Sequence, residues 1–179
     1  MSRIAIPALS EATGATADVY ARVRKIAGGG VPNLFAALGH LAPATLNAAL
    51  DAEGALASSS LSKQDLETIK LLISELTGCD YCVAAHVMLG KMAGLSPVAL
   101  KQIRTGQPTG DTKRDALIHF VRTLQTTRGT IDEEDLAAIR AAGYSDRQLA
   151  EISLAIAMTI FTNMFNRIND TAVDFPAVD

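Results

Sequence analysis

Hydrophobic and polar residues follow a three-to-four-residue period along nearly the whole chain, which is the pattern of amphipathic helices. The strict alternation that marks strands is absent from the sequence. Helix boundaries carry breakers and capping residues, such as the glycines at 28–30 and a variant capping box of Ser62 with Asp65. The sequence therefore predicts an all-α fold with helices over residues 11–27, 33–41, 43–56, 63–77, 80–93, 97–104, 112–127, 132–142 and 146–169.

The predicted helices form one domain over residues 1–179. Its motif-bearing part covers about residues 33–105, and a C-terminal helical part covers about residues 112–170. We expect the final segment DFPAVD to lie extended on the surface, with Phe175 as its anchor.

Two pairs of segments in the chain resemble each other and hint at an internal duplication. Residues 94–103 resemble residues 143–152, and residues 62–73 resemble residues 145–156. Capped amphipathic helices also share such patterns without a common origin. A duplicated helical unit and a chance likeness therefore both stay open.

The composition narrows the possible partners. Hydrophobic residues make up 49% of the chain and aromatic residues only 4%, which favours closely packed helices with apolar surface shared between subunits. The formal net charge is −3 with no basic run, so nucleic acid is not an expected partner. Apolar runs end before the roughly 20 residues of a membrane helix, and the N-terminal stretch is too short for a secretory signal. We expect a cytoplasmic protein that does not bind a membrane.

Both cysteines lie in the stretch GCDYCVAAH, which is the most specific feature of the sequence. Cys79, Cys82 and His86 are three and four residues apart, so a helix presents them on one face. Gly78 ends the preceding helix, and Cys79 therefore sits at the start of the next, where the helix dipole stabilises a thiolate. The pair can close a reversible disulfide, with an imidazole nearby to take a proton.

A histidine that moves protons needs a partner that orients its ring. The preceding helix offers two carboxylates, Glu67 and Glu75. Glu67 lies about three turns before the end of that helix, so in an antiparallel neighbour it reaches the level of His86. Glu75 lies nearer Cys79 and is expected to be an ordinary solvated residue.

Other interpretations of these residues stay open. Two thiolates, His86 and Glu67 offer four zinc ligands, although structural zinc sites usually contain a second ligand pair and this chain has none. The cysteines could also be inert and buried. Haem attachment requires a histidine directly after the second cysteine, which is not the case here. His40 and His119 lack cysteine or acidic clusters and are not expected to be ligands.

The pattern of Glu67, eleven residues, then Cys79-x-x-Cys82-x-x-x-His86 resembles the alkylhydroperoxidase D-like branch of the carboxymuconolactone decarboxylase family. The segments VPNLFAALGH, MAGLSP and FTNMFNRINDTAVDFP are similar too, so the resemblance spans most of the chain. It implies an oligomeric alkylhydroperoxidase D-like helical bundle, a trimer or hexamer, without a bound cofactor or metal.

The resemblance also implies an activity, that of a thiol-dependent peroxide reductase. Glu67 and His86 would form a proton relay to Cys82, a peroxide would oxidise Cys82, and Cys79 would close the disulfide. A protein dithiol or lipoyl-type donor would reopen it. Helix-dipole reasoning instead makes Cys79 the thiol that meets an outside disulfide, and one cycle can contain both steps. The alternative is a non-enzymatic oligomeric redox sensor, or a general dithiol–disulfide oxidoreductase without peroxidase turnover.

The sequence departs from the peroxidases of that family directly before the second cysteine. They carry a second histidine there, and this chain has Tyr81. A phenol, with a pKa of about 10, shares protons poorly at neutral pH. Tyr81 is therefore a supporting residue that packs near the dithiol or contacts a substrate, and it predicts weak peroxidase activity or a different oxidant.

Overall fold

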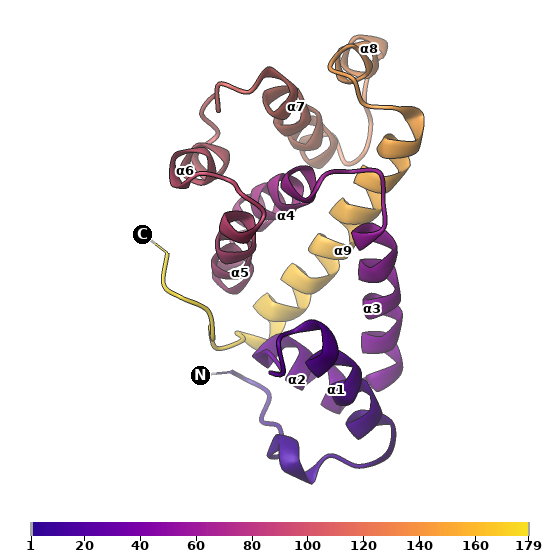
Figure 1. Cartoon of the computed structure of the whole chain (residues 1–179), viewed down its shortest axis with the longest axis vertical. Coiled ribbons are helices and arrows are strands. Elements are labelled where there is room, and N and C mark those ends of the chain that lie inside the picture. The colour runs from indigo at the N-terminus through magenta and orange to yellow at the C-terminus, as the bar shows by residue number, and fades with distance from the viewer. Residues whose placement is uncertain (1, 179) are drawn as a thin grey trace.

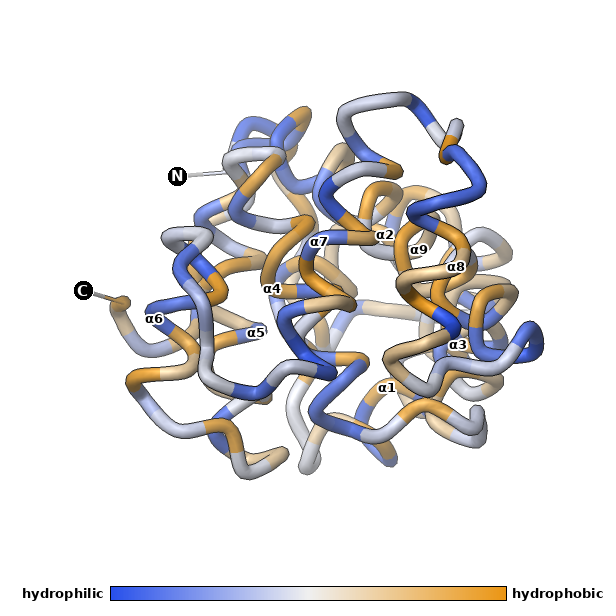
Figure 2. The backbone as a smooth tube through the Cα atoms, turned by 90° about the horizontal axis from the view of Figure 1, so that it is seen from above, coloured by the Kyte–Doolittle hydropathy of each residue, from blue (hydrophilic) through white to orange (hydrophobic). Residues whose placement is uncertain are grey.

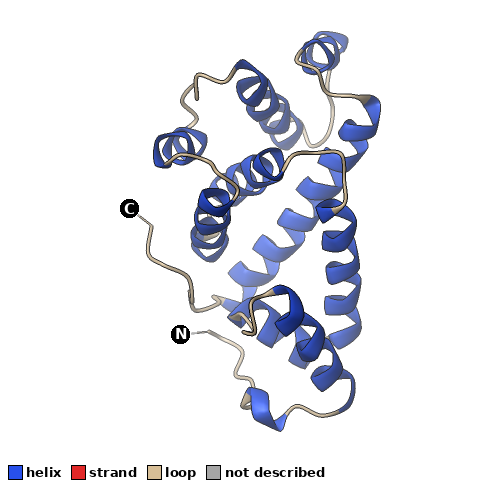
Figure 3. Cartoon of the chain, in the orientation of Figure 1, coloured by secondary structure: helices blue, strands red, loops and turns tan. Residues whose placement is uncertain are grey.

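A computed structural model describes residues 2–178, and this part of the chain contains helices and no strand (Figure 3). The all-α prediction is confirmed. One short 3-10 helix, η1, covers Leu9–Glu11. The α-helices are α1 (Gly14–Ile26), α2 (Asn33–Leu41), α3 (Pro43–Ala57), α4 (Lys63–Thr77), α5 (Asp80–Met92), α6 (Pro97–Thr105), α7 (Thr112–Thr126), α8 (Glu133–Ala141) and α9 (Asp146–Asn169).

Most helix boundaries lie within one or two residues of their predicted positions because the caps form as the sequence indicates. The hydroxyl of Ser62 accepts the backbone N–H of Asp65, and the carboxylate of Asp65 accepts the N–H of Ser62. The predicted start of the first helix at Glu11 is wrong. Thr13 is extended and Gly14 has a φ of +54°, so α1 begins at Gly14 and η1 stands apart from it.

Helices α4 and α9 lie at the centre of the fold (Figure 1). α9 packs against α4, α3 and α5, while α6 and α7 pack against α4 from its other sides. α1, α2 and α3 contact one another and form one end of the molecule. Hydrophobic and hydrophilic stretches alternate along the helices in Figure 2, as expected of helices that bury one face.

The buried side chains form two clusters. The main core lies among α4 to α9 and the end of α3, and the residues at its centre are Ile69, Leu71, Leu72, Ile73, Ile103, Leu117, Val121, Ile152 and Ala155. The second cluster joins α1 to α3 with the start of α5, and we call it the dithiol cluster because it contains both cysteines. Its buried residues are Val19, Tyr20, Val23, Leu34, Leu38, Leu46, Leu50, Cys79, Tyr81 and Cys82.

Among residues 2–178, one helix, α9, is long and apolar enough by composition to cross a membrane. The core helix of a soluble protein passes the same test. Uninterrupted apolar runs do not reveal it because Ser153, Thr159 and Thr162 break them. In this fold α9 packs against α3, α4 and α5, and 28% of its most apolar window is buried.

Candidate active site

The turn between α4 and α5 places the first cysteine. Gly78 has a φ of +66°, which ends α4 and lets α5 begin at Asp80. Cys79 is the N-cap of α5, and its Sγ accepts the backbone N–H of Cys82 at 3.3 Å. Its sulfur therefore lies at the positive end of the helix dipole, where a thiolate is stabilised.

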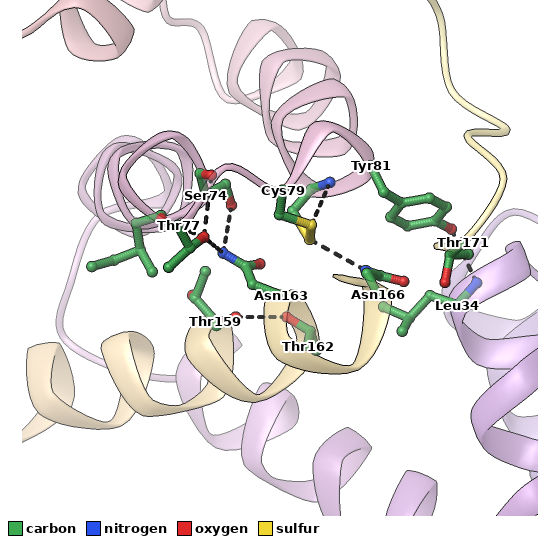
Figure 4. The surroundings of a disulfide bond; sticks show 12 residues. Leu34, Ser74, Thr77, Cys79, Tyr81, Thr159, Thr162, Asn163, Asn166 and Thr171 are labelled. Carbon is green, nitrogen blue, oxygen red and sulfur yellow. Dashed lines mark hydrogen bonds between the residues drawn. A yellow bond between two sulfur atoms is a disulfide. The ribbon is translucent and has the colours of Figure 1, made fainter. Parts of the chain in front are cut away.

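Cys79 and Cys82 form a disulfide across the first turn of α5 (Figure 4). Their Cα atoms are 5.3 Å apart, within the usual range for a disulfide. The two residues are only 2% and 3% exposed. The pair is therefore close enough to open and close with little backbone movement, inside a shielded apolar environment.

Glu67 and His86 meet across the α4–α5 pair. The carboxylate Oε2 of Glu67 lies 2.9 Å from Nδ1 of His86, and both side chains are 14% exposed. A carboxylate accepts the proton on Nδ1, which leaves Nε2 as the basic nitrogen of a neutral ring. The antiparallel packing thus gives the imidazole the orienting acid that the sequence predicted.

Tyr81 projects from α5 toward α2 and the C-terminal tail rather than toward the sulfurs (Figure 4). Its hydroxyl accepts the backbone N–H of Leu34 at 3.2 Å, and its ring meets Phe175 edge-on at 5.2 Å. Burial raises the pKa of Tyr81 well above 10, and the nearby Asp174 carboxylate adds to the increase. Tyr81 thus keeps its proton at neutral pH and attaches the tail through Phe175, which lies partly buried as expected.

The remaining sequence candidates lie elsewhere. Glu75 pairs with Arg104 at 2.9 Å and is not the partner of His86. His119 is exposed and contacts Asp135, and His40 lines a surface pocket of about 250 Å³. Between residues 2 and 178, no three His, Cys, Asp or Glu side chains converge as a set of metal ligands.

Sequence reasoning missed Asn166. Its Nδ2 donates to Sγ of Cys82 at 3.2 Å, from the far end of α9 (Figure 4). The available signal was a row of asparagines at 163, 166 and 169 on a largely apolar helix. Amides at that spacing share one helix face, and buried amides need partners.

The comparison with protein families gives one match, to the carboxymuconolactone decarboxylase family over residues 41–107. This segment is similar to that family. It contains both cysteines, Glu67 and His86, so the family segment is also the part of the chain with the candidate chemistry. No curated protein matches the chain.

Several solved structures resemble most of the chain in fold. An alkylhydroperoxidase AhpD core, a peroxidase-related protein from Ralstonia eutropha JMP134, has a TM-score of 0.83 at 23% identity and covers 97% of this chain and 92% of its own. A peroxidase-related protein from Silicibacter sp. TM1040 has a TM-score of 0.78 at 21% identity, with coverages of 96% and 91%. The debrominase Bmp8, in complex with 2,3,4-tribromopyrrole, has a TM-score of 0.68 at 16% identity, with coverages of 88% and 84%. These likenesses establish the alkylhydroperoxidase D-like fold.

Proposed function

We propose that this protein is a thiol-dependent peroxide reductase that cycles between a Cys79/Cys82 dithiol and a disulfide. The observation that carries the proposal is the disulfide at the start of α5, one turn before a histidine that a partly buried carboxylate orients. The peroxidase-related descriptions of two proteins with the same fold support it.

In the proposed cycle, the Cys82 thiolate attacks one oxygen of the peroxide. The O–O bond breaks, the leaving oxygen takes a proton to give an alcohol, and Cys82 becomes a sulfenic acid. The Cys79 thiolate then attacks the Cys82 sulfur, water leaves, and the disulfide closes. An external dithiol, a small protein or a lipoyl-type group, returns two electrons and two protons and becomes a disulfide itself.

His86 and Glu67 act as the proton relay in this scheme. Glu67 holds the Nδ1 proton at 2.9 Å, so Nε2 of His86 accepts the proton of Cys82, directly or through a water molecule, and returns it to the leaving oxygen. Residues in such a relay raise the rate of chemistry without being consumed. Tyr81, which stands where related peroxidases carry a second histidine, takes no part in proton transfer because burial favours its neutral form.

The burial of both sulfurs favours a small oxidant. The cysteines lie within the dithiol cluster, and the partly buried rings of Phe161, Phe165 and Phe175 pack against this cluster. A small hydroperoxide needs little space to reach them, whereas a protein reductant needs Cys79 to become exposed. The position of Cys79 at the N-terminus of α5, where the helix dipole stabilises a thiolate, makes it the sulfur that meets the reductant.

Self-association is part of the proposal. The outer face of α9 presents an apolar stripe of Leu154, Ala157, Phe161, Met164 and Ile168, at alternating steps of three and four residues. That spacing is typical of helices that pair with a second copy of the same helix. We expect a trimer or hexamer in the cytoplasm, with this stripe at a subunit interface.

The rival hypothesis is a redox sensor, whose disulfide forms once and changes partner binding, or a dithiol oxidoreductase without peroxidase turnover. Counting turnovers separates them. With excess alkyl hydroperoxide and excess dithiothreitol, we expect the wild-type protein to consume many equivalents of peroxide and Cys82→Ser to consume none above background. His40→Gln, at an exposed site away from the dithiol, is the matched control and should keep full turnover.

One oxidation per molecule would support the sensor, and full turnover by Cys82→Ser would overturn both hypotheses. The assay should include a brominated pyrrole, because reductive debromination also takes two electrons from a dithiol and one protein with this fold is a debrominase. If the protein turned over the brominated pyrrole and not the peroxide, the brominated compound would take the place of the peroxide as the proposed oxidant.

A further inference from the structure

Three buried amides lie in a row on the inner face of α9. Asn163, Asn166 and Asn169 are 1%, 2% and 0% exposed and three residues apart. The outer two have structural partners. Asn163 donates to Oγ1 of Thr77 at 2.8 Å, and Oδ1 of Asn169 accepts the backbone N–H of Ile4 at 2.8 Å. These bonds attach α9 to the end of α4 and to the N-terminal segment.

Asn166 has a different donor contact. Its Nδ2 donates to Sγ of Cys82 at 3.2 Å. The Oδ1 atoms of Asn163 and Asn166 are both buried without a hydrogen-bond partner, so the contact with sulfur is what distinguishes Asn166. A sulfur atom in a disulfide is a weak acceptor, so this contact stabilises the oxidised state little.

Reduction of the disulfide changes the acceptor that the amide N–H meets. A Cys82 thiolate is a charged acceptor, and hydrogen bonds to ionised groups are about twice as strong as neutral ones. The contact therefore favours the reduced state with Cys82 ionised.

We propose that Asn166 is a further catalytic residue, which stabilises the Cys82 thiolate through its Nδ2–H; the proposal rests on the dithiol function above. Cys79 has separate donors, the backbone N–H of Cys82 and the α5 N-terminus. Each sulfur thus has its own source of N–H, and Asn166 acts on Cys82 alone.

This arrangement also directs the reductive half of the cycle. When an external thiolate attacks Sγ of Cys79, the S–S bond breaks and its electron pair moves to Sγ of Cys82. A leaving sulfur that is stabilised as a thiolate departs faster. Asn166 therefore favours attack at Cys79, the sulfur that lies at the helix start.

The test isolates Cys82 in a Cys79→Ser background and measures its alkylation by iodoacetamide as a function of pH. Asn166→Ala and Asn166→Leu remove the donor. We expect either change to raise the midpoint of the alkylation curve by about one pH unit and to slow alkylation at neutral pH about tenfold, because thiolate is the reactive form. One of the two variants is sufficient for the test if its circular dichroism spectrum shows that it folds like the wild type.

Asn163→Ala is the matched control, because it removes a neighbouring buried amide that bonds Thr77 and not a sulfur. It should lower the melting temperature without moving the midpoint. An unchanged midpoint in a folded Asn166 variant, or an equal change in Asn163→Ala, would overturn the inference. The titration needs no peroxide, so it is independent of whether the protein turns over peroxide.

Discussion

The main core and the dithiol cluster are built from the same helical pattern but enclose different chemistry. In the main core, α4 and α9 meet through Ile69, Ile73 and Ile152, with side chains that can only pack. In the dithiol cluster, the apolar helices α1 to α3 enclose two sulfurs and a phenol at the start of α5. Asn166, on the inner face of α9, adds an amide to them.

The difference shows how one long helix serves two purposes. The first half of α9 contributes Ile152, Ala155 and Ile156 to the main core. Its second half carries the buried amides that face α4 and the disulfide. We therefore expect changes in the main core to alter stability and leave the thiols unaffected, and changes around the dithiol to alter chemistry first.

The largest effect is expected at the relay. Glu67→Gln keeps the size of the side chain but replaces the carboxylate that orients His86. General acid–base catalysis contributes roughly 10²–10⁴-fold to a rate, so steady-state peroxide turnover should fall by about a hundredfold or more. Glu75 lies on α4 like Glu67 but pairs with Arg104 of α6, so Glu75→Gln should retain turnover. Equal losses in the two variants would contradict a specific role for Glu67.

A main-core deletion should have a large effect on stability alone. Ile152→Ala removes a fully buried side chain and should lower the free energy of unfolding by about 2–5 kcal/mol. Urea denaturation measures the loss, and iodoacetamide alkylation of the reduced, folded protein should keep its wild-type rate. A changed alkylation rate would show that the two clusters are coupled.

Loss of a helix cap should have a smaller effect. Ser62→Ala removes the hydroxyl that accepts the backbone N–H of Asp65 at the start of α4 and should cost about 1 kcal/mol. Ser145→Ala removes the equivalent acceptor for the N–H of Gln148 at the start of α9 and should cost about the same. Thermal unfolding of the two variants checks this. If only one of the two variants lost stability, α4 and α9 would differ in how much their caps stabilise them.

The smallest expected effect is a change of stability with pH that involves one buried tyrosine in each cluster. Burial raises the pKa of Tyr81 in the dithiol cluster and that of Tyr144 in the main core, where the hydrogen bond to Asp65 adds to the increase. Above pH 10 the unfolded chain releases these protons while the folded protein keeps them, so the free energy of unfolding should fall as pH rises. Urea denaturation at about pH 8 and about pH 11 measures this decline.

Tyr81→Phe and Tyr144→Phe should each remove part of the alkaline decline. Both variants lose one hydrogen bond, so a small loss of stability at neutral pH is expected as well. If the free energy of unfolding fell as steeply at alkaline pH in both variants as in the wild type, groups other than these tyrosines would cause the fall.

Local signals in the sequence were enough to predict most of the fold. The capping box at Ser62 and the glycine at Gly78 fix the two ends of α4, and the spacing of Glu67 to His86 follows from two antiparallel helices joined by a short turn. Glycine at a helix end and paired caps act within a few residues, which is why sequence reading finds them.

The contact of Asn166 with Cys82 could not be read from sequence in the same way. It joins residues 84 positions apart and depends on how far α9 slides along α4 and α5, which is set by the packing of the whole core. The alignment that set residues 62–73 against 145–156 pairs Gly78 with Phe161, where α9 continues without a break. The likeness therefore covers the caps and the apolar faces, and not the turn that carries the cysteines.

The most direct test is a single-turnover titration of the reduced protein with one equivalent of alkyl hydroperoxide, followed by a thiol count and peptide mapping. We predict that one equivalent of peroxide removes both thiols and leaves a Cys79–Cys82 disulfide, which dithiothreitol then reverses. Consumption of the peroxide with both thiols intact would contradict the account.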